Sequence, residues 1–342
     1  MESEQLDIKT DEINSLGSQN EELENGVKNK ASYKSTFKSN DTEEWLDVVF
    51  TRPIGYQWAK FFDKFDIHPN TVTVLSMILG GACGFFFVYR ADTPHGLLMN
   101  VIGVLLLMWA NFYDSADGQL ARMSGKKSEL GRILDGVSGD VWFFCIYVGI
   151  VVRLWHQTIP GTSMQWGVWG FMLAAVAGFL CHAPQSSLSD YYRQIHLYFL
   201  LGKEGSELDS SAQQRQIYES LPKSKWFERL FRYNYANYCQ GQEHRTPRFQ
   251  AFFREVKSRW PDAADMPQNL RDAFRAGSLP LMKYTNMLTF NVRAITIYVT
   301  CLLDCPWVYL LVEVIILNIM YAYMHRTHER LCDTLYNQFL KR

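Results

Sequence analysis

The sequence has 342 residues, of which 48% are hydrophobic and 20% charged, and its formal net charge is −1. This near-neutral balance excludes a bulk polycation and argues against a protein that binds nucleic acid mainly through charge. The composition also excludes collagen-like and wholly disordered chains. Its apolar residues are concentrated in a few long runs, which is typical of a membrane protein.

The first residues, 1–44, are rich in Glu, Asp, Asn, Ser and Lys and almost free of aromatic residues. Such a segment cannot bury enough apolar area to offset the entropy of ordering, so we expect a disordered cytosolic tail. Residues 45–67 then interleave aromatic side chains with Arg52, Lys60 and Lys64. This pattern indicates an amphipathic helix, which either lies in the lipid headgroup region or packs against its own protein.

Long apolar runs follow. Residues 71–89 carry no charge over a length that crosses about 30 Å of hydrocarbon. Similar runs occupy 96–113, 141–152, 166–183, 284–303 and 307–323. The sequence therefore predicts an all-α membrane bundle of six transmembrane helices, four within 68–183 and two within 284–324.

The distribution of basic residues predicts the orientation of this bundle. Segments 91–95, 154–165 and 304–306 contain no Lys or Arg, whereas 118–134 and 184–283 contain many. By the positive-inside rule, both termini are cytosolic, and so are a helical insertion at 184–283 and a C-terminal tail at 325–342.

Acidic residues gather at the expected cytosolic ends of the second and third spans. Asp114 and Asp117 lie three residues apart, on one face of a helix, and Asp135 and Asp140 begin the next span. Carboxylates at membrane depth are costly unless they are paired or bind metal. Oxygen ligands of this kind suit two Mg²⁺ or Mn²⁺ ions, which would clamp a diphosphate.

Small and basic residues follow the first acidic pair. Gly118 and Ala121 leave room for a ligand against the backbone, and Arg122 supplies a cation for a phosphate. In the purely structural alternative, Arg122 and Arg132 neutralise the acids and no ligand is bound.

The spacing Asp114-x2-Asp117-Gly118-x2-Ala121-Arg122-x8-Gly131-x3-Asp135 resembles the signature of the CDP-alcohol phosphotransferases, integral membrane enzymes that typically have six helices. The resemblance implies that an alcohol attacks a CDP-linked phosphate and that CMP leaves. It also implies that the acids hold two divalent ions and that the CDP moiety contacts Gly118, Ala121 and Arg122. His68-Pro69-Asn70-x2-Thr73 resembles the family's entry to its first helix, so further candidate contacts are Asn70, Thr73 and Gly131.

The chain departs from this signature at one position. The family's last acid, its proposed base, stands four residues after the acid matched by Asp135, and Gly139 occupies that position here. One residue turns a helical side chain by about 100°. We expect Asp140 to replace the missing acid as base and metal ligand through a local irregularity, which Gly136 and Gly139 favour. Otherwise the base is a different residue, or the protein is a weakened relative.

Basic residues are the candidates for binding the acceptor. Arg293 lies within an apolar run, so it should point into the bundle, towards an anionic acceptor or lipid phosphate, with an ion pair to Glu313 as the structural alternative. Arg193 and Lys126 are further candidates at the cytosolic rim.

The favoured function is transfer from CDP-diacylglycerol to a polar alcohol, with inositol or inositol phosphate preferred. The alternatives are transfer from CDP-choline or CDP-ethanolamine to a lipid alcohol, and a catalytically weak scaffold that recruits partners through 184–283. The resemblance also implies a homodimer. A transporter is disfavoured because paired broken helices at midplane depth are missing from the pattern.

Overall fold

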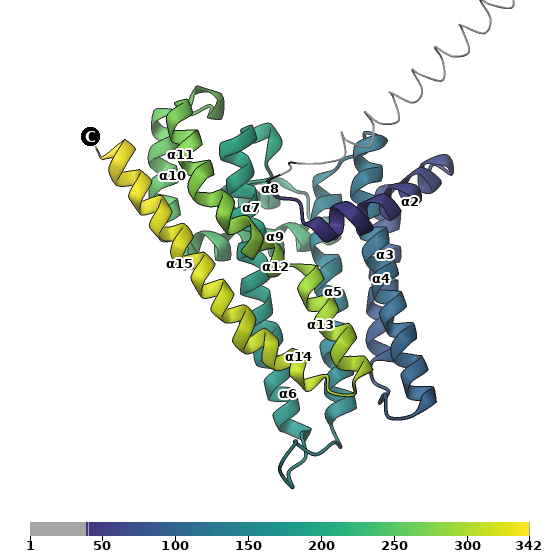
Figure 1. Ribbon diagram of the computed structural model, residues 1–342. Coiled ribbons are helices and arrows are strands. Elements are labelled where there is room, and N and C mark those ends of the chain that lie inside the picture. The colour runs from purple at the N-terminus through teal and green to yellow at the C-terminus, as the bar shows by residue number, and fades with distance from the viewer. Residues whose placement is uncertain (1–38, 40, 342) are drawn as a thin grey trace, which may run out of the picture.

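A computed structural model describes residues 39 and 41–341, and its regular elements over these residues are all helices (Figure 1). The expected tail at 1–44 lies mostly outside the described residues. Its last part, 41–44, is held in place, because Arg275 donates hydrogen bonds to both carboxylate oxygens of Asp41, at 2.7 and 3.0 Å.

Five helical stretches are long and apolar enough to cross a membrane. The first three are α3 (Pro69–Phe86), α4 (Pro94–Met123) and most of α5 (Glu129–Leu154). The fourth runs without a break through α6 (Gly167–Ala175), η2 (Val176–His182) and α7 (Ala183–Leu201). The fifth joins α14 (Trp307–Leu311), η6 (Val312–Leu317), α15 (Asn318–Leu335) and η7 (Tyr336–Leu340).

The remaining expected span, at 284–303, is the fifth along the chain, and it is not continuous. It is divided between α12 (Met282–Met287) and α13 (Phe290–Leu302). The 13 residues of α13 measure about 20 Å, less than the roughly 30 Å of hydrocarbon. The guanidinium of Arg293 donates to the carbonyls of Leu288 and Thr289 at the interruption, and so satisfies groups that the broken helix leaves without partners.

The expected amphipathic helix is present. It comprises the π-helical turn η1 (Asp47–Thr51) and α2 (Arg52–Lys64), which crosses α3 and α4 near one end of the bundle (Figure 1). Ala59 and Phe62 are buried against the bundle, whereas Phe61 and Phe65 are exposed. One face of α2 therefore packs on the protein, and the other exposes Phe61 among the polar side chains of Lys60, Asp63 and Lys64.

The insertion at 184–283 is helical, as expected, but it does not begin as a separate unit. The fourth span continues to Leu201 over 35 residues, or about 50 Å. The remainder folds into α8 (Ser211–Ser220), α9 (Trp226–Arg245), α10 (Pro247–Arg259) and α11 (Gln268–Ser278), with the 3₁₀ turns η3 (Lys203–Gly205), η4 (Ala263–Asp265) and η5 (Leu279–Leu281).

The expected C-terminal tail at 325–342 is instead the end of the last long helix as far as Leu340. This helix rises beside α10 and α11 at the end of the bundle opposite the α5–α6 connection (Figure 1). Phe252 of α10, Phe274 of α11 and Leu335 of α15 share a buried core with α7. The insertion and the C-terminal segment thus form one packed layer above the membrane bundle.

Glycines bring α3 and α5 into backbone contact. A Cβ on Gly149 would lie 2.2 Å from the carbonyl oxygen of Gly84, and a Cβ on Gly84 would lie 2.4 Å from that of Cys145. Only residues without side chains allow this approach. This contact lies towards the ends of α3 and α5 and holds the two helices side by side.

Candidate active site

The length of α4 places its acids at the membrane boundary. The helix begins after Thr93, whose Oγ1 accepts a hydrogen bond from the amide of Gly96 at 3.1 Å. About 20 residues cross the hydrocarbon, which brings the chain from Pro94 to Tyr113. The next turns carry Asp114 and Asp117, so these carboxylates lie at headgroup level when α4 spans the bilayer.

A helix cap positions the third acid. The Oγ of Ser128 accepts a hydrogen bond from the amide of Gly131 at 3.0 Å, and α5 starts at the next residue after Ser128. Asp135 therefore falls in the second turn of α5. A Cβ on Gly131 would lie 2.8 Å from Oδ1 of Asn70, so these two candidate residues mark the close approach of α3 to α5.

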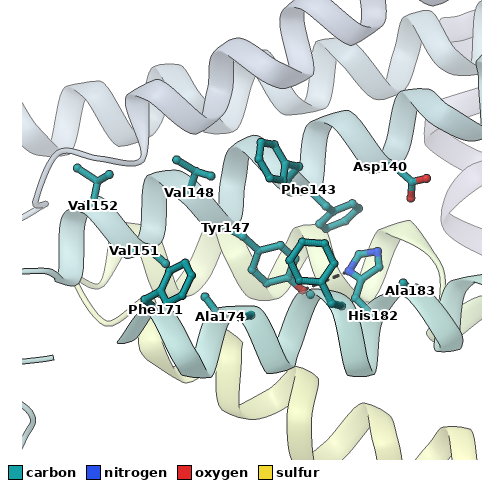
Figure 2. Close-up of a pocket in the computed structure, with 14 residues that line it drawn as sticks. Asp140, Phe143, Tyr147, Val148, Val151, Val152, Phe171, Ala174, His182 and Ala183 are labelled. Atoms are coloured by element: carbon teal, nitrogen blue, oxygen red, sulfur yellow. Dashed lines mark hydrogen bonds between the residues drawn. The ribbon is translucent and has the colours of Figure 1, made fainter. Parts of the chain in front are cut away.

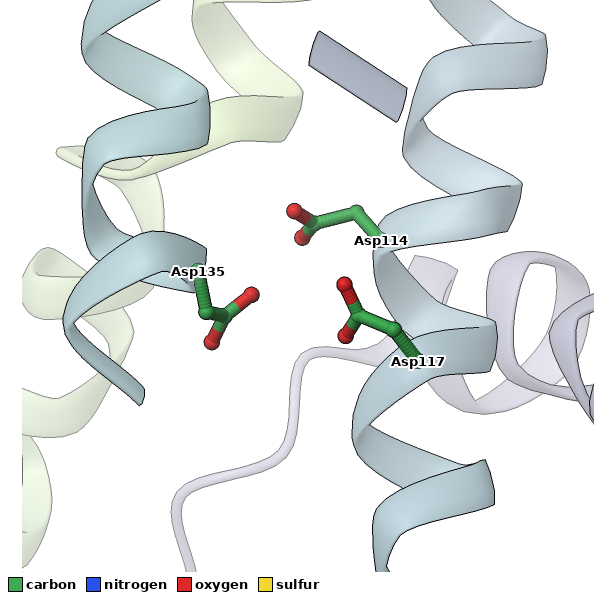
Figure 3. Close-up of side chains that lie close together, drawn as sticks. All are labelled: Asp114, Asp117 and Asp135. Carbon is green, nitrogen blue, oxygen red and sulfur yellow. The ribbon is translucent and has the colours of Figure 1, made fainter. Parts of the chain in front are cut away.

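The three acids converge. Asp114, Asp117 and Asp135 each offer a carboxylate oxygen, and these atoms lie within 4.8 Å of one another. Figure 3 shows Asp135 pointing from α5 towards the two acids of α4. Three like charges at this separation repel one another, and a divalent cation stabilises the arrangement. The donor set of three hard oxygens matches Mg²⁺ or Mn²⁺.

Two hydroxyl groups orient these carboxylates. Ser138 donates to Asp114 Oδ1 at 2.8 Å, and Thr73 donates to Asp117 Oδ2 at 2.5 Å. The contact of Thr73 is thus with an acid of the cluster. The sequence singled out Thr73 by resemblance alone and gave no signal for Ser138.

The neighbouring arginines do not form ion pairs with this cluster. Arg132 binds Asp209 of the insertion, and its guanidinium lies 5.5 Å from the ring centroid of Tyr235. Arg122 folds back over Gly118, with Nη1 3.4 Å from the position of a Cβ on that glycine. Its buried Nε has no hydrogen-bond partner among the described residues. Arg122 therefore keeps a hydrogen-bond donor for a ligand beside Gly118. Ala121 lies one turn of α4 after Asp117.

Asp140 does not join the cluster, so the expectation that it serves as metal ligand and base is wrong. Helix α5 is regular from Glu129 to Leu154, without the irregularity that this role requires. Over five residues the helix turns by about 500°, which leaves Asp140 about 140° away from Asp135. Asp140 lines a separate pocket between α5 and α6. Cβ atoms on Gly136 and Gly139 would meet nothing within 4 Å, so open space borders α5 at the position of the missing acid.

Arg293 is also not an acceptor-binding residue. Its side chain is 1% exposed, that of Glu313 is 0% exposed, and the two form an ion pair at 3.1 Å. Gln185 accepts a further hydrogen bond from Arg293 at 2.6 Å. All the donors of this guanidinium are satisfied inside the protein, so the structural alternative is confirmed.

The other two candidates for the acceptor lie nearer the surface. Arg193 is half-buried and donates to Asn286 Oδ1 at 3.0 Å. Lys126 forms an ion pair at 2.5 Å with the exposed Asp66. Lys126 is thus engaged at the surface, whereas Arg193 lies in a polar cluster.

This cluster includes residues that sequence reasoning missed. Asn291 Nδ2 donates to Glu44 Oε2 at 2.8 Å and to Asp47 Oδ1 at 3.0 Å. Burial raises the pKa of Glu44, even though Asn291 donates a hydrogen bond to it. Glu44 is attracted electrostatically to Arg193, and Asp47 is close enough to repel Asp114 of the acid cluster. No spacing pattern connects positions so far apart, so sequence reasoning could not place this segment beside the site.

Comparison with known proteins finds a family similarity over part of the chain. The chain is an integral membrane protein whose site lies within a segment, residues 66–189, that matches the CDP-alcohol phosphatidyltransferase family. The match to this family, whose members are transferases, covers about a third of the chain. All three acids of the cluster, together with Asn70 and Thr73, fall inside the matched segment.

The chain is also similar to a protein of Aquifex aeolicus (strain VF5) that is described as uncharacterized. The two are 36% identical over 77 residues, which cover 22% of this chain and 35% of that protein. The chain thus spans about a third of the length of this curated relative. No solved structure matches.

Proposed function

We propose that the protein transfers a substituted phosphate from a CDP-linked donor to the hydroxyl of an alcohol, with release of CMP. One observation carries this proposal: Asp114, Asp117 and Asp135 converge within 4.8 Å inside the segment matched by the family. The hydroxyl oxygen forms a bond to phosphorus, the phosphorus–oxygen bond to CMP breaks, and the proton of the alcohol is removed by a base.

The three acids would hold divalent cations, Mg²⁺ or Mn²⁺, two of them by resemblance to the family. Such ions neutralise a diphosphate and stabilise its leaving group. Thr73 and Ser138 keep the carboxylates turned towards the shared space, which limits the reorganisation on binding.

The donor would lie along α4. Gly118 lets a phosphate approach the helix, and Arg122 offers its guanidinium there. Ala121, Asn70 and Gly131 border the same region and are further candidate contacts.

Asp135 takes the role of base in this proposal. It is the exposed acid of the three, and it adjoins the open space at Gly136 and Gly139. An alcohol that enters by this space meets Asp135 before the buried Asp117, which is 4% exposed.

For the substrates we propose CDP-diacylglycerol as donor and a polar alcohol, inositol or inositol phosphate, as acceptor. The polar cluster of Arg193, Asn286, Glu44 and Asn291 offers both donors and acceptors of hydrogen bonds, which suits a polyhydroxylated ligand. Following the distribution of basic residues, we assign the site and both termini to the cytosolic side. A homodimer is part of the same proposal.

The test is CMP release by the purified full chain in detergent, with labelled CDP-diacylglycerol, Mn²⁺ and a panel of polar and lipid alcohols. We expect release with a polar alcohol, and its loss in Asp117→Asn. Asp63→Asn is the matched control, because Asp63 is an exposed acid on α2. Absence of release with every donor and acceptor would refute the proposal and favour the scaffold, for which Gly139 is the supporting observation. Release only with CDP-choline or CDP-ethanolamine and a lipid alcohol would correct the substrates.

A further inference from the structure

A groove lies between α5 and the helix formed by α6 and η2, on the side of α5 away from the acid cluster. Its volume is about 510 Å³. Figure 2 shows the residues that line it. It extends along α5 from Asp140 to Val152, which is about 18 Å at 1.5 Å per residue. One leaflet contributes about half of the 30 Å hydrocarbon core. The α5–α6 groove therefore has the length of one lipid chain.

The walls of this groove are apolar and open to the surroundings. Phe144, Val148 and Val152 of α5 and Phe171 and Phe179 of the facing helix have exposed side chains. These side chains would face lipid in a bilayer, so the groove is accessible to an acyl chain.

A π-helix shapes the facing wall. Pro184 has no amide hydrogen to donate to the preceding turn, and the turns before it widen into η2, Val176–His182. Gly178 in this stretch faces Tyr147, whose ring would lie 3.4 Å from a Cβ on the glycine. The absence of a side chain there keeps the groove open, and π-helical turns of this kind are frequent at functional sites.

The polar side chains that line the groove are those of Asp140, Tyr147 and His182. His182 is 7% exposed and accepts or donates one hydrogen bond, between Nδ1 and the hydroxyl of Tyr147 at 3.3 Å (Figure 2). Tyr147 also bonds the hydroxyl of Tyr309 at 3.0 Å. Within residues 41–341, neither Nε2 of His182 nor the carboxylate of Asp140 makes a hydrogen bond, although both residues line the groove.

The charge of Asp140 favours a lipid with an uncharged headgroup in the groove. None of the described residues that line the groove is Lys or Arg, and Asp140 repels a phosphate. A hydroxyl group, by contrast, donates to the Asp140 carboxylate and accepts from Nε2 of His182.

We propose that the α5–α6 groove binds a neutral lipid alcohol, the class to which diacylglycerol belongs. The hydroxyl lies between Asp140 and His182, and one acyl chain follows α5 towards Val152. Because Asp140 lies about 140° around α5 from Asp135, this is a lipid site separate from the acid cluster. It requires no transferase activity.

The test is photolabelling of the full chain in nanodiscs of phosphatidylcholine, without any CDP-linked donor. The probe is diacylglycerol with a diazirine in one acyl chain, and labelled peptides are mapped by mass spectrometry. We expect labels at 143–152 and 171–179, and competition by unlabelled diacylglycerol at a concentration roughly tenfold below that needed for phosphatidic acid.

One variant tests the binding of the acyl chain, and another tests the recognition of the headgroup. Ala175→Trp fills the groove, and we expect it to abolish labelling there, whereas Leu105→Trp introduces the same side chain at an exposed position on α4 and leaves labelling unchanged. Asp140→Val should keep the labelled positions but remove the preference for diacylglycerol. Equal competition by phosphatidic acid in the unmodified protein, or labelling unaffected by Ala175→Trp, would overturn the proposal.

Discussion

The hydroxyl of Thr73, in the second turn of α3, donates a 2.5 Å hydrogen bond to Oδ2 of Asp117, near the end of α4. Thr73 is buried, and Asp117 is one of the three acids that share the candidate metal site. Thr73 belongs to the motif at the start of the first span, and Asp117 belongs to the acid signature of the second. This hydrogen bond therefore connects the two motifs.

Replacing Thr73 should therefore weaken the metal site. Thr73→Val removes the hydroxyl at nearly constant volume, and loss of such an orienting partner typically lowers metal affinity or activity by about 10- to 100-fold. We expect a higher Mn²⁺ concentration for half-maximal CMP release. Thr73→Ser keeps the donor and should behave like the unmodified protein. Equal Mn²⁺ dependence of the two variants would contradict the role assigned to this hydroxyl.

Adding an acid at position 139 should strengthen the site. A side chain there meets nothing within 4 Å, and it stands one helical turn after Asp135, about 40° around α5. Gly139→Asp should thus lower the Mn²⁺ concentration needed for half-maximal CMP release. Gly139→Ala is the control for helix propensity, which favours Ala over Gly by about 1 kcal/mol. If both variants gave the Mn²⁺ dependence of the unmodified protein, the open space would not adjoin the metal site.

Breaking the buried ion pair should destabilise the fold. Arg293→Met leaves the carboxylate of Glu313 buried without its partner, which typically costs about 3–5 kcal/mol of unfolding free energy. The double variant Arg293→Met with Glu313→Leu removes both charges, and we expect it to be the more stable of the two. Denaturant unfolding in detergent measures the difference. A stable Arg293→Met protein with an increased KM for the acceptor would restore the acceptor role that the structure contradicts.

The stability contributed by Asp304 should depend on pH. Burial alone would raise the pKa of Asp304, but hydrogen bonds from Arg153 at 2.6 Å and Arg90 at 3.0 Å outweigh it and hold the pKa below its usual value. A carboxyl group with a lowered pKa in the folded state contributes stability above its unfolded pKa of about 3.9, and this contribution is lost as the pH falls through the folded value.

Asp304→Asn should accordingly lower the melting temperature in detergent at pH 7, by an amount that shrinks below about pH 4. Asp92→Asn is the control, because Asp92 also contacts Arg90 but its side chain is 43% exposed, against 20% for Asp304. A deficit for Asp304→Asn that stays constant between pH 7 and pH 3 would show that the ion pairs do not carry this stability.

Short-range sequence patterns determined where the long helices lie and which acids converge. The apolar runs predicted the long helices, the cap and turn residues near Pro69, Pro94 and Ser128 mark where they begin, and the acid spacing predicted the cluster. These features depend on residues within one or two turns of each other, and helical periodicity converts such spacing directly into a shared face. The resemblance to the CDP-alcohol phosphatidyltransferases followed from the same short-range pattern.

Tertiary structure decided the rest. The regular helix of α5 turned Asp140 away from Asp135 and into the α5–α6 groove, and Glu313, from another helix, paired with Arg293. The C-terminal residues 325–340 stayed helical because α10 and α11 cover them. Each outcome depends on partners many turns away along the chain or on other helices, and local periodicity carries no information about which distant side chain fills a given space.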